Sequence, residues 1–281
     1  MKLGKKPFIE DKRDLIFNNY AIATVLPSRP KVFGHQNMIS NWGMLGNDTV
    51  GDCVVAGSCH ETMLWTTEGG NPAAFTDANA ISDYSAITGY NPNDPKTDQG
   101  TVVREALLYR QKTGIIDSKL SRHKIGAFLQ LDQNNIDEIL EAIYLFNAIG
   151  IGILFPQSAM NQFNMGQPWT VVKGSRIEGG HYVSCIGYDL DYIYCVTWGK
   201  IQKMDYNFFT TYCDEGWAIL SQEFLNGQGV SPEGFNLEQL QADLNAITNS
   251  PIPNPTLLVP RLRKTKAKTK TRVRPHKKKK H

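Results

Sequence analysis

The spacing of apolar residues divides this chain into a first part with mostly helical periodicity and a second part with mostly strand periodicity. Up to residue 147, apolar residues recur chiefly every three to four positions, which is typical of amphipathic helices. Gly89 and Gly114 follow two of these stretches, and glycine is common just after a helix ends. We therefore predict helices at residues 52–67, 75–91, 102–113 and 134–147.

Beyond residue 147 the pattern changes to short apolar runs and to alternation of apolar and polar residues, which favour strands. The predicted strands are residues 150–155, 181–188, 192–199 and 216–220, with a strand pair inside 117–131 and one further helix at 237–247.

Cys53 is the first candidate for chemistry. The turn-prone run from Gly46 to Gly51 leads into Asp52, a residue type that favours the N-cap, so Cys53 lies in the first turn of the predicted helix. The free N–H groups and the positive end of the helix dipole there favour a thiolate over a thiol. Cys53 is therefore a candidate nucleophile that needs a base, and a plain core thiol is the alternative.

His181 is the candidate base. Gly179 and Gly180 precede it and admit close approach of another backbone, and His181 begins a predicted strand. The next strand ends in Thr197-Trp198-Gly199. A structural histidine in the core is the alternative.

Taken in order, these motifs resemble the papain-like cysteine proteases, in which a cysteine at a helix N-terminus faces a Gly-His strand followed by a strand that ends in Trp-Gly. Cys53 precedes His181 by 128 residues and Thr197 by 144, in agreement with the roughly 130–150 typical of that family. The resemblance extends over about residues 26–225. Within the family, the chain most resembles compact members from bacteria and their phages. We expect no long helical inhibitory prosegment, because too few residues precede Cys53.

The resemblance implies an α+β fold of the papain-like type, with a helical half, an antiparallel β-sheet or barrel half, and an active-site cleft between them. The chain would then begin with a strap at 1–34 and continue with the papain-like domain at 35–225, whose halves meet near residue 115. A helical extension at 226–249, a proline linker at 250–260 and a disordered basic tail at 261–281 would follow. Met160, Phe163 and Met165 would line a specificity pocket or belong to the core.

The resemblance also implies the roles of site residues, with two departures from the family pattern. Cys53 would attack a carbonyl, His181 would carry the proton, and Asn47 stands where the family has its oxyanion glutamine. Aligning the Trp-Gly pair places Val196 at the position of the family's orienting asparagine. A shift by one residue would give that role to Thr197.

Composition restricts the class of protein. The chain has 281 residues, of which 41% are apolar and 20% charged, and no run approaches 18 apolar residues, so we expect a soluble globular protein without membrane spans. No apolar segment follows the basic N-terminus, so we expect no secretory signal and a cytoplasmic location. The five cysteines lack metal-ligand spacing. We expect reduced thiols, no metal and no cofactor.

The charge is distributed unevenly. Twelve Lys and Arg residues and no acidic residue lie between Arg261 and His281, which leaves 18 basic against 27 acidic residues, a formal charge of −9, in the rest of the chain. We expect this tail to bind polyanions such as nucleic acid without sequence preference; a localisation signal or an aid to solubility are alternatives.

Two functions remain open on the sequence alone. The first is a thiol hydrolase, most simply a cysteine peptidase acting on peptide or protein substrates. The second is a catalytically inactive papain-fold module that associates through its basic tail with nucleic acid or with a nucleoprotein assembly such as a virus particle.

Overall fold

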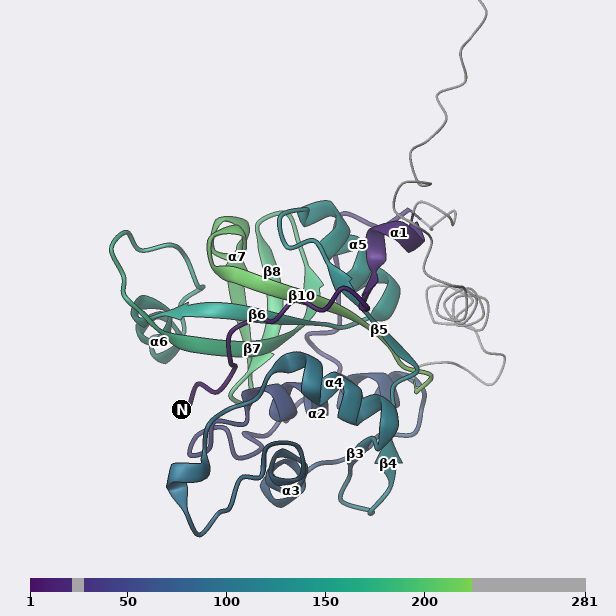
Figure 1. Ribbon diagram of the computed structural model, residues 1–281. Coiled ribbons are helices and arrows are strands. Elements are labelled where there is room, and N and C mark those ends of the chain that lie inside the picture. The colour runs from purple at the N-terminus through teal and green to yellow at the C-terminus, as the bar shows by residue number, and fades with distance from the viewer. Residues whose placement is uncertain (22–27, 224–281) are drawn as a thin grey trace, which may run out of the picture. The chain divides into compact units, whose positions relative to one another are not determined.

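The computed structural model describes residues 1–21 and 28–223 (Figure 1). The helix predicted at 237–247, the proline linker and the basic tail lie outside these residues. The helices of the described part are α1 Phe17–Ala21, α2 Cys53–Glu68, α3 Asp77–Thr88, α4 Val103–Lys112, α5 Ile136–Phe146, α6 Gln157–Asn164 and α7 Tyr206–Tyr212, with a 3-10 turn at Pro95–Thr97.

One large sheet dominates the second half of the described chain. The strands are β1 Leu15–Ile16, β2 Phe33–Gly34, β3 Ile115–Ile116, β4 Arg122–His123, β5 Ala127–Leu131, β6 Ile149–Pro156, β7 Ile177–Tyr188, β8 Tyr192–Thr197, β9 Lys200–Asp205 and β10 Cys213–Leu220. The large sheet has the order β1-β5-β10-β6-β7-β8-β9, with β2 also on β7, and only the β1–β5 pair is parallel. The predicted α+β class is confirmed.

Helices α2, α3 and α4 gather on one side of this sheet, below it in Figure 1. Helix α2 lies against β7 because Gly57 has no side chain, and a Cβ at this position would come within 2.6 Å of the Tyr182 ring. The Tyr182 hydroxyl donates to Glu61 Oε1 at 2.7 Å, and the Ser184 hydroxyl donates to the Gly57 carbonyl at 2.9 Å. These contacts fix the middle of α2 against β7.

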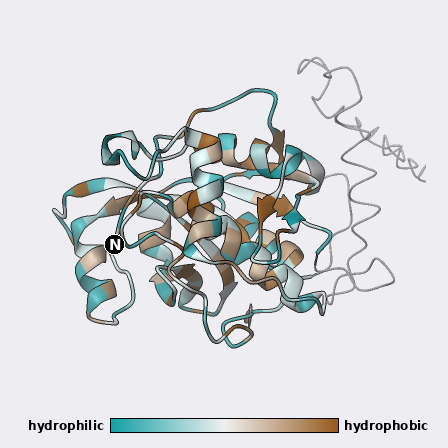
Figure 2. Cartoon of the chain, turned by 90° about the horizontal axis from the view of Figure 1, so that it is seen from below, coloured by the Kyte–Doolittle hydropathy of each residue, from teal (hydrophilic) through white to brown (hydrophobic). Residues whose placement is uncertain are grey.

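Helix α2 is enclosed on almost every side, and its buried charge is paired. Glu61 is fully buried and accepts a hydrogen bond at 2.6 Å from Arg110 on α4, which is itself 1% exposed. Removing either partner of such a buried ion pair would lower the stability of the fold, because the other charge would stay buried without a partner. Elsewhere, apolar and polar residues alternate along the helices, as the brown and teal colouring in Figure 2 shows.

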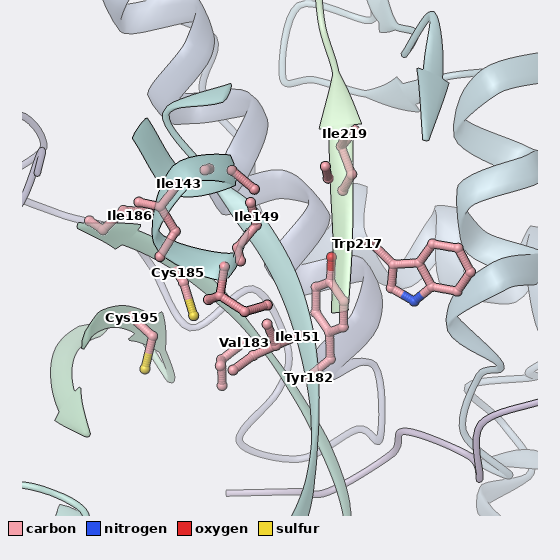
Figure 3. Packing of buried hydrophobic residues seen from close by; sticks show 14 of the residues in the cluster. Ile143, Ile149, Ile151, Tyr182, Val183, Cys185, Ile186, Cys195, Trp217 and Ile219 are labelled. Carbon is pink, nitrogen blue, oxygen red and sulfur yellow. The ribbon is translucent and has the colours of Figure 1, made fainter. Parts of the chain in front are cut away.

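The main core lies between α5 and the sheet. Figure 3 shows Ile143 of α5 near Ile149 of β6 and Ile186 of β7, with Val183 of β7 further along the same core. All four are 0% exposed, so each contributes on the order of 1.5–3 kcal/mol through burial. The central strands that carry this core also carry His181, which places one half of the candidate site on a rigid support.

Some predicted segments differ from the observed elements. The pair expected within 117–131 is formed instead by β3 with β4, while β5 joins the large sheet between β1 and β10. Strand β10 begins at Cys213, earlier than predicted, after the short helix α7. Within residues 1–21 and 28–223, no helix is both long and apolar enough to cross a bilayer.

Candidate active site

Cys53 is the first residue of α2, as predicted, but its thiol is covered. The side chain is 1% exposed, and Asp52 occupies the N-cap position without a side-chain capping bond. Burial raises the pKa of the Cys53 thiol to about 12, although hydrogen bonding from the backbone N–H groups of Tyr182 and Gly4 acts in the opposite direction. The expectation of a favoured thiolate is therefore wrong for this closed conformation, because desolvation outweighs the helix terminus.

His181 lies within β7, which begins at Ile177, and not at the start of the strand as predicted. None of its surface is exposed. Its ring stacks on Trp198 at 4.3 Å between centroids and 17° between planes, and Phe155 meets it edge-on at 5.4 Å. Burial lowers the pKa of His181 to about 3, so the imidazole is neutral at ordinary pH. Its Nδ1 has no hydrogen-bond partner among the described residues.

Thr197, rather than Val196, meets His181. The Thr197 Oγ1 lies 2.7 Å from His181 Nε2 and is hydrogen-bonded to it, whereas Val196 pairs with Ser184 across the sheet and belongs to the core. The contact with His181 therefore corresponds to the alignment shifted by one residue, in which Thr197 and not Val196 takes the position of the family's asparagine.

The turn after Thr197 explains this arrangement. Thr197 pairs with Lys200 across β8 and β9, so Trp198 and Gly199 are the two central residues of a tight hairpin. Their φ angles are 45° and 72°, the left-handed conformation that such a turn requires and that costs a tryptophan of order 1 kcal/mol or more. The turn brings the Trp198 ring onto His181, so this local strain supports the position of the histidine.

Asn47 is close to the start of α2, but its side-chain amide already has a partner. It is 2% exposed, and its Nδ2 donates to the Val50 carbonyl at 3.0 Å within the turn that precedes Cys53. Its own backbone carbonyl accepts from the Lys2 N–H at 2.8 Å. Asn47 therefore stabilises the turn, and its role as an oxyanion donor stays a prediction.

Residues 2–6, which we call the cleft segment, lie across the candidate site. In Figure 1 the purple N-terminal segment starts on the side of the helices and runs upward across β7 and β6. On the helical side it bonds to Asn47 and Thr101, and on the sheet side to Gly180 and Trp198. The bonds are Lys2 N–H to Asn47 O (2.8 Å), Trp198 Nε1–H to Lys2 O (3.3 Å), Gly4 N–H to Gly180 O (3.2 Å), Thr101 N–H to Gly4 O (2.8 Å), Lys5 N–H to Gly180 O (3.0 Å) and Lys6 N–H to Thr101 O (2.9 Å).

The side chain of Lys5 enters a closed acidic pocket. Its Nζ lies 2.8 Å from Asp214 Oδ2 and 3.0 Å from Glu215 Oε1, and the lysine side chain is 0% exposed. Burial by itself would lower the pKa of Lys5, but the two carboxylates outweigh it and the pKa is raised. Sequence reasoning missed these three residues, and no local signal connects Lys5 to partners more than two hundred positions away.

The described part of the chain offers no metal site, since it contains no group of three or more His, Cys, Asp or Glu side chains placed to hold an ion. All five cysteines are free thiols. Of the residues expected to line a specificity pocket, Phe163 is 4% exposed and packs on Trp198, whereas Met165 is 63% exposed.

Comparison with solved structures identifies the fold. No family model and no curated protein matches the sequence. Xylellain, a cysteine protease from Xylella fastidiosa, superposes with a TM-score of 0.60 at 17% identity, over 78% of this chain and 96% of that one. A procathepsin B from Trypanosoma congolense gives 0.57 at 12% identity, over 78% and 86%. A cysteine protease of Carica candamarcensis gives 0.52 at 12%, over 69% and 99%. The chain has a papain-like fold, as predicted.

Proposed function

We propose that this chain, with its papain-like fold, is a cysteine peptidase in which Cys53 is the nucleophile and His181 the general base. The observation that carries the proposal is the state of the His181 ring. Thr197 holds Nε2 at 2.7 Å, and Nδ1 is left without a partner among the described residues. Nucleophilic catalysis by a Cys–His pair requires a base that is oriented through one ring nitrogen and reaches the thiol through the other. The bond to Thr197 supplies the first condition. Since no hydrogen bond joins Nδ1 to Cys53 among the described residues, the second condition would be met only after the site rearranges.

The reaction would proceed in two halves. His181 Nδ1 accepts the proton of the Cys53 thiol, and the sulfur attacks the carbonyl carbon of the scissile bond, whose oxygen becomes an oxyanion. The N–H of Cys53 and a side-chain N–H of Asn47 would stabilise that charge. His181 then gives its proton to the leaving amine, which departs and leaves a thioester. Water, deprotonated by His181, attacks the thioester and releases the acid product and the thiol.

The closed conformation is a resting state in this scheme. A thiol with a pKa of about 12 and an imidazole with a pKa of about 3 are both neutral, and no substrate reaches either of them. Displacing the cleft segment would return water to both groups. The pKa of His181 would then rise toward 6.5, and that of Cys53 would fall toward or below 8.5 under the influence of the α2 N-terminus.

The covered site also fits the alternative of a catalytically inactive module, whose basic tail would bind nucleic acid or a nucleoprotein assembly. Hydrolysis separates the two functions. Fluorescently labelled casein should be cleaved by the full chain, slowly, and by a Lys5→Met variant, faster. Cys53→Ala should abolish cleavage in both backgrounds. If Lys5→Met leaves Cys53 open to iodoacetamide and casein is still not cleaved, the inactive module is the correct assignment.

A further inference from the structure

Two of the buried cysteines lie directly opposite each other on neighbouring strands. Cys185 of β7 and Cys195 of β8 are Cα partners in the antiparallel β7–β8 pair, and both are 0% exposed free thiols. Directly paired residues point to the same face of a sheet, so the two thiols share one side of it. Figure 3 shows the two sulfur atoms near each other in the core. Burial, and after it the neighbouring Cys195 thiol, raises the pKa of Cys185 well above its ordinary value.

The hairpin between β8 and β9 determines how closely the two cysteines approach. Thr197 and Lys200 flank its two-residue turn, and such a turn is closed by a hydrogen bond between the flanking residues. Pairs with and without mutual hydrogen bonds alternate along an antiparallel ladder, so Cys195 and Gln202 also form a hydrogen-bonded pair. The peptide groups of Cys195 therefore face β9, and Cys195 and Cys185 are a pair without mutual hydrogen bonds. The Cα atoms of such a pair are about 4.5 Å apart.

That separation permits a disulfide. Bridged cysteines have Cα atoms about 4.4–6.8 Å apart, so the strands need no large movement for the two sulfurs to bond. The separation lies at the short end of this range, and a bond in strained geometry is easier to reduce than a relaxed one. Cys53 and Cys59 differ in this respect, because six residues along α2 separate them by about 9 Å, which is too far for a bridge.

The cysteine pair lies beside the contact that orients the candidate base. His181 precedes Cys185 by four residues on β7, and Thr197 follows Cys195 by two residues on β8, so all four side chains lie on one face of the sheet. The 2.7 Å contact between Thr197 and His181 belongs to the register that pairs Cys185 with Cys195. A slip of β8 by two residues would keep the faces but separate the hydroxyl from the imidazole.

The β7–β8 ladder that sets this register is short. It has four paired positions, and a register shift between Cys185 and Gly187 interrupts it. Strands β8 and β9 form one end of the large sheet, so their hairpin can separate from β7 without parting any other two strands of the sheet. Such a local opening would break the contact between Thr197 and His181 and would expose both thiols.

We propose that Cys185 and Cys195 form a reversible cross-strand disulfide in oxidising surroundings, and that this bond fixes the register that holds Thr197 on His181. The oxidant would be a small disulfide such as oxidised glutathione. In a reducing compartment the pair would remain a dithiol, as in the structure. The disulfide would form whether or not the chain hydrolyses peptides.

The reaction is a pair of thiol–disulfide exchanges. During a local opening, one cysteine attacks a sulfur of the oxidant as its thiolate, and a mixed disulfide forms while one glutathione thiolate leaves. The second cysteine then attacks the protein sulfur of the mixed disulfide, and the second glutathione thiolate leaves. The two protons of the cysteines pass to the two released thiolates, so the protein dithiol is oxidised and the glutathione disulfide is reduced.

The first experiment uses the full chain without substitutions. The folded protein is incubated with oxidised glutathione or with dithiothreitol, alkylated with iodoacetamide in urea and digested with trypsin. Both cysteines lie in one tryptic peptide, residues 177–200, so the disulfide appears as this peptide without alkyl groups and two hydrogen atoms lighter. We expect this form to predominate after oxidised glutathione and to be absent after dithiothreitol. Two alkyl groups on the peptide after oxidised glutathione would overturn the proposal.

Two controls test whether the paired strands determine the reaction. Cys53 and Cys59 share another tryptic peptide, residues 32–96, which should contain no internal disulfide under either condition. An internal disulfide there as well would show that oxidation follows general unfolding, and would contradict the proposal. Cys213 is half-buried on β10, and Cys213→Ala should leave the disulfide of residues 177–200 unchanged. Loss of the disulfide in this variant would refute the assignment to Cys185 and Cys195 alone.

The second measurement tests whether the bond fixes the register. The disulfide closes the loop of residues 185–195 and so restricts the opening of β8 from β7. Amide hydrogen exchange within Tyr192–Thr197 should therefore be at least about tenfold slower in the oxidised chain than in the reduced chain. Cys195→Ala is the matched control and should exchange at one rate under both conditions. Equal exchange in the oxidised and reduced wild type would reject the role of the bond in the register.

Discussion

The hydrogen bond between Thr197 and His181 gives the most direct test of the catalytic scheme. Thr197→Val removes the hydroxyl with almost no change in shape at a position that is 3% exposed. His181 Nε2 then loses a 2.7 Å bond in a site without solvent. An unsatisfied buried polar group costs about 1–3 kcal/mol, which corresponds to roughly 5- to 150-fold if it is expressed in the rate.

The structure explains why this loss should stay well below the roughly 10⁴-fold that follows loss of the third member in other triads. Trp198 stacks on the His181 ring and Phe155 supports its edge, so the plane of the ring remains fixed without Thr197. In the proposed scheme the hydroxyl accepts a hydrogen bond from Nε2–H, and this tautomer leaves Nδ1 able to accept the proton of Cys53. We therefore expect a fall in kcat of about 10- to 100-fold with KM little changed.

The assay is peptide hydrolysis in the Lys5→Met background, together with ¹⁵N NMR of the His181 ring to report its tautomer. Thr197→Ser should restore most of the rate, because it returns the hydroxyl. Thr62→Val removes a comparable buried hydroxyl, which donates at 3.0 Å to the Ser58 carbonyl within α2, and controls for general destabilisation. A Thr197→Val variant with wild-type kcat and an unchanged tautomer would refute the orienting role.

Three further outcomes are expected. Asn47→Ala should lower kcat by about 100-fold and lower the free energy of unfolding by about 1 kcal/mol. An unchanged kcat would show that Asn47 only stabilises the turn before Cys53. Burial lowers the pKa of His181 to about 3 and that of His60 to about 4, so the unfolded chain takes up protons first. Urea unfolding should show stability falling from pH 6.5 to 4, by about 1.4 kcal/mol per pH unit for each histidine, and a flat profile would contradict these pKa shifts. If about six cations of the tail at 261–281 contact phosphates, binding to duplex DNA should have a log–log salt slope near −5, and a chain ending at Ile252 should lose that binding.

The sequence by itself predicted the elements whose signals are local. The apolar spacing after Asp52 and the turn-prone residues before it placed the start of α2 at Cys53, and alternation after Gly180 predicted β7 with His181 in it. These patterns depend on the period of a helix or a strand, which neighbouring residues determine among themselves. Their order along the chain was sufficient to predict the papain-like fold.

Only the tertiary structure decided which side chains meet and how solvent reaches them. The hairpin at Trp198 and Gly199 selected Thr197 over Val196 as the partner of His181, a choice that one residue of register reverses. Lys5 meets Asp214 across 209 positions of the chain, a contact with no trace in local spacing. The burial of Cys53 also reverses the pKa shift expected from its helix terminus, because desolvation depends on everything packed around a group and not on the sequence beside it.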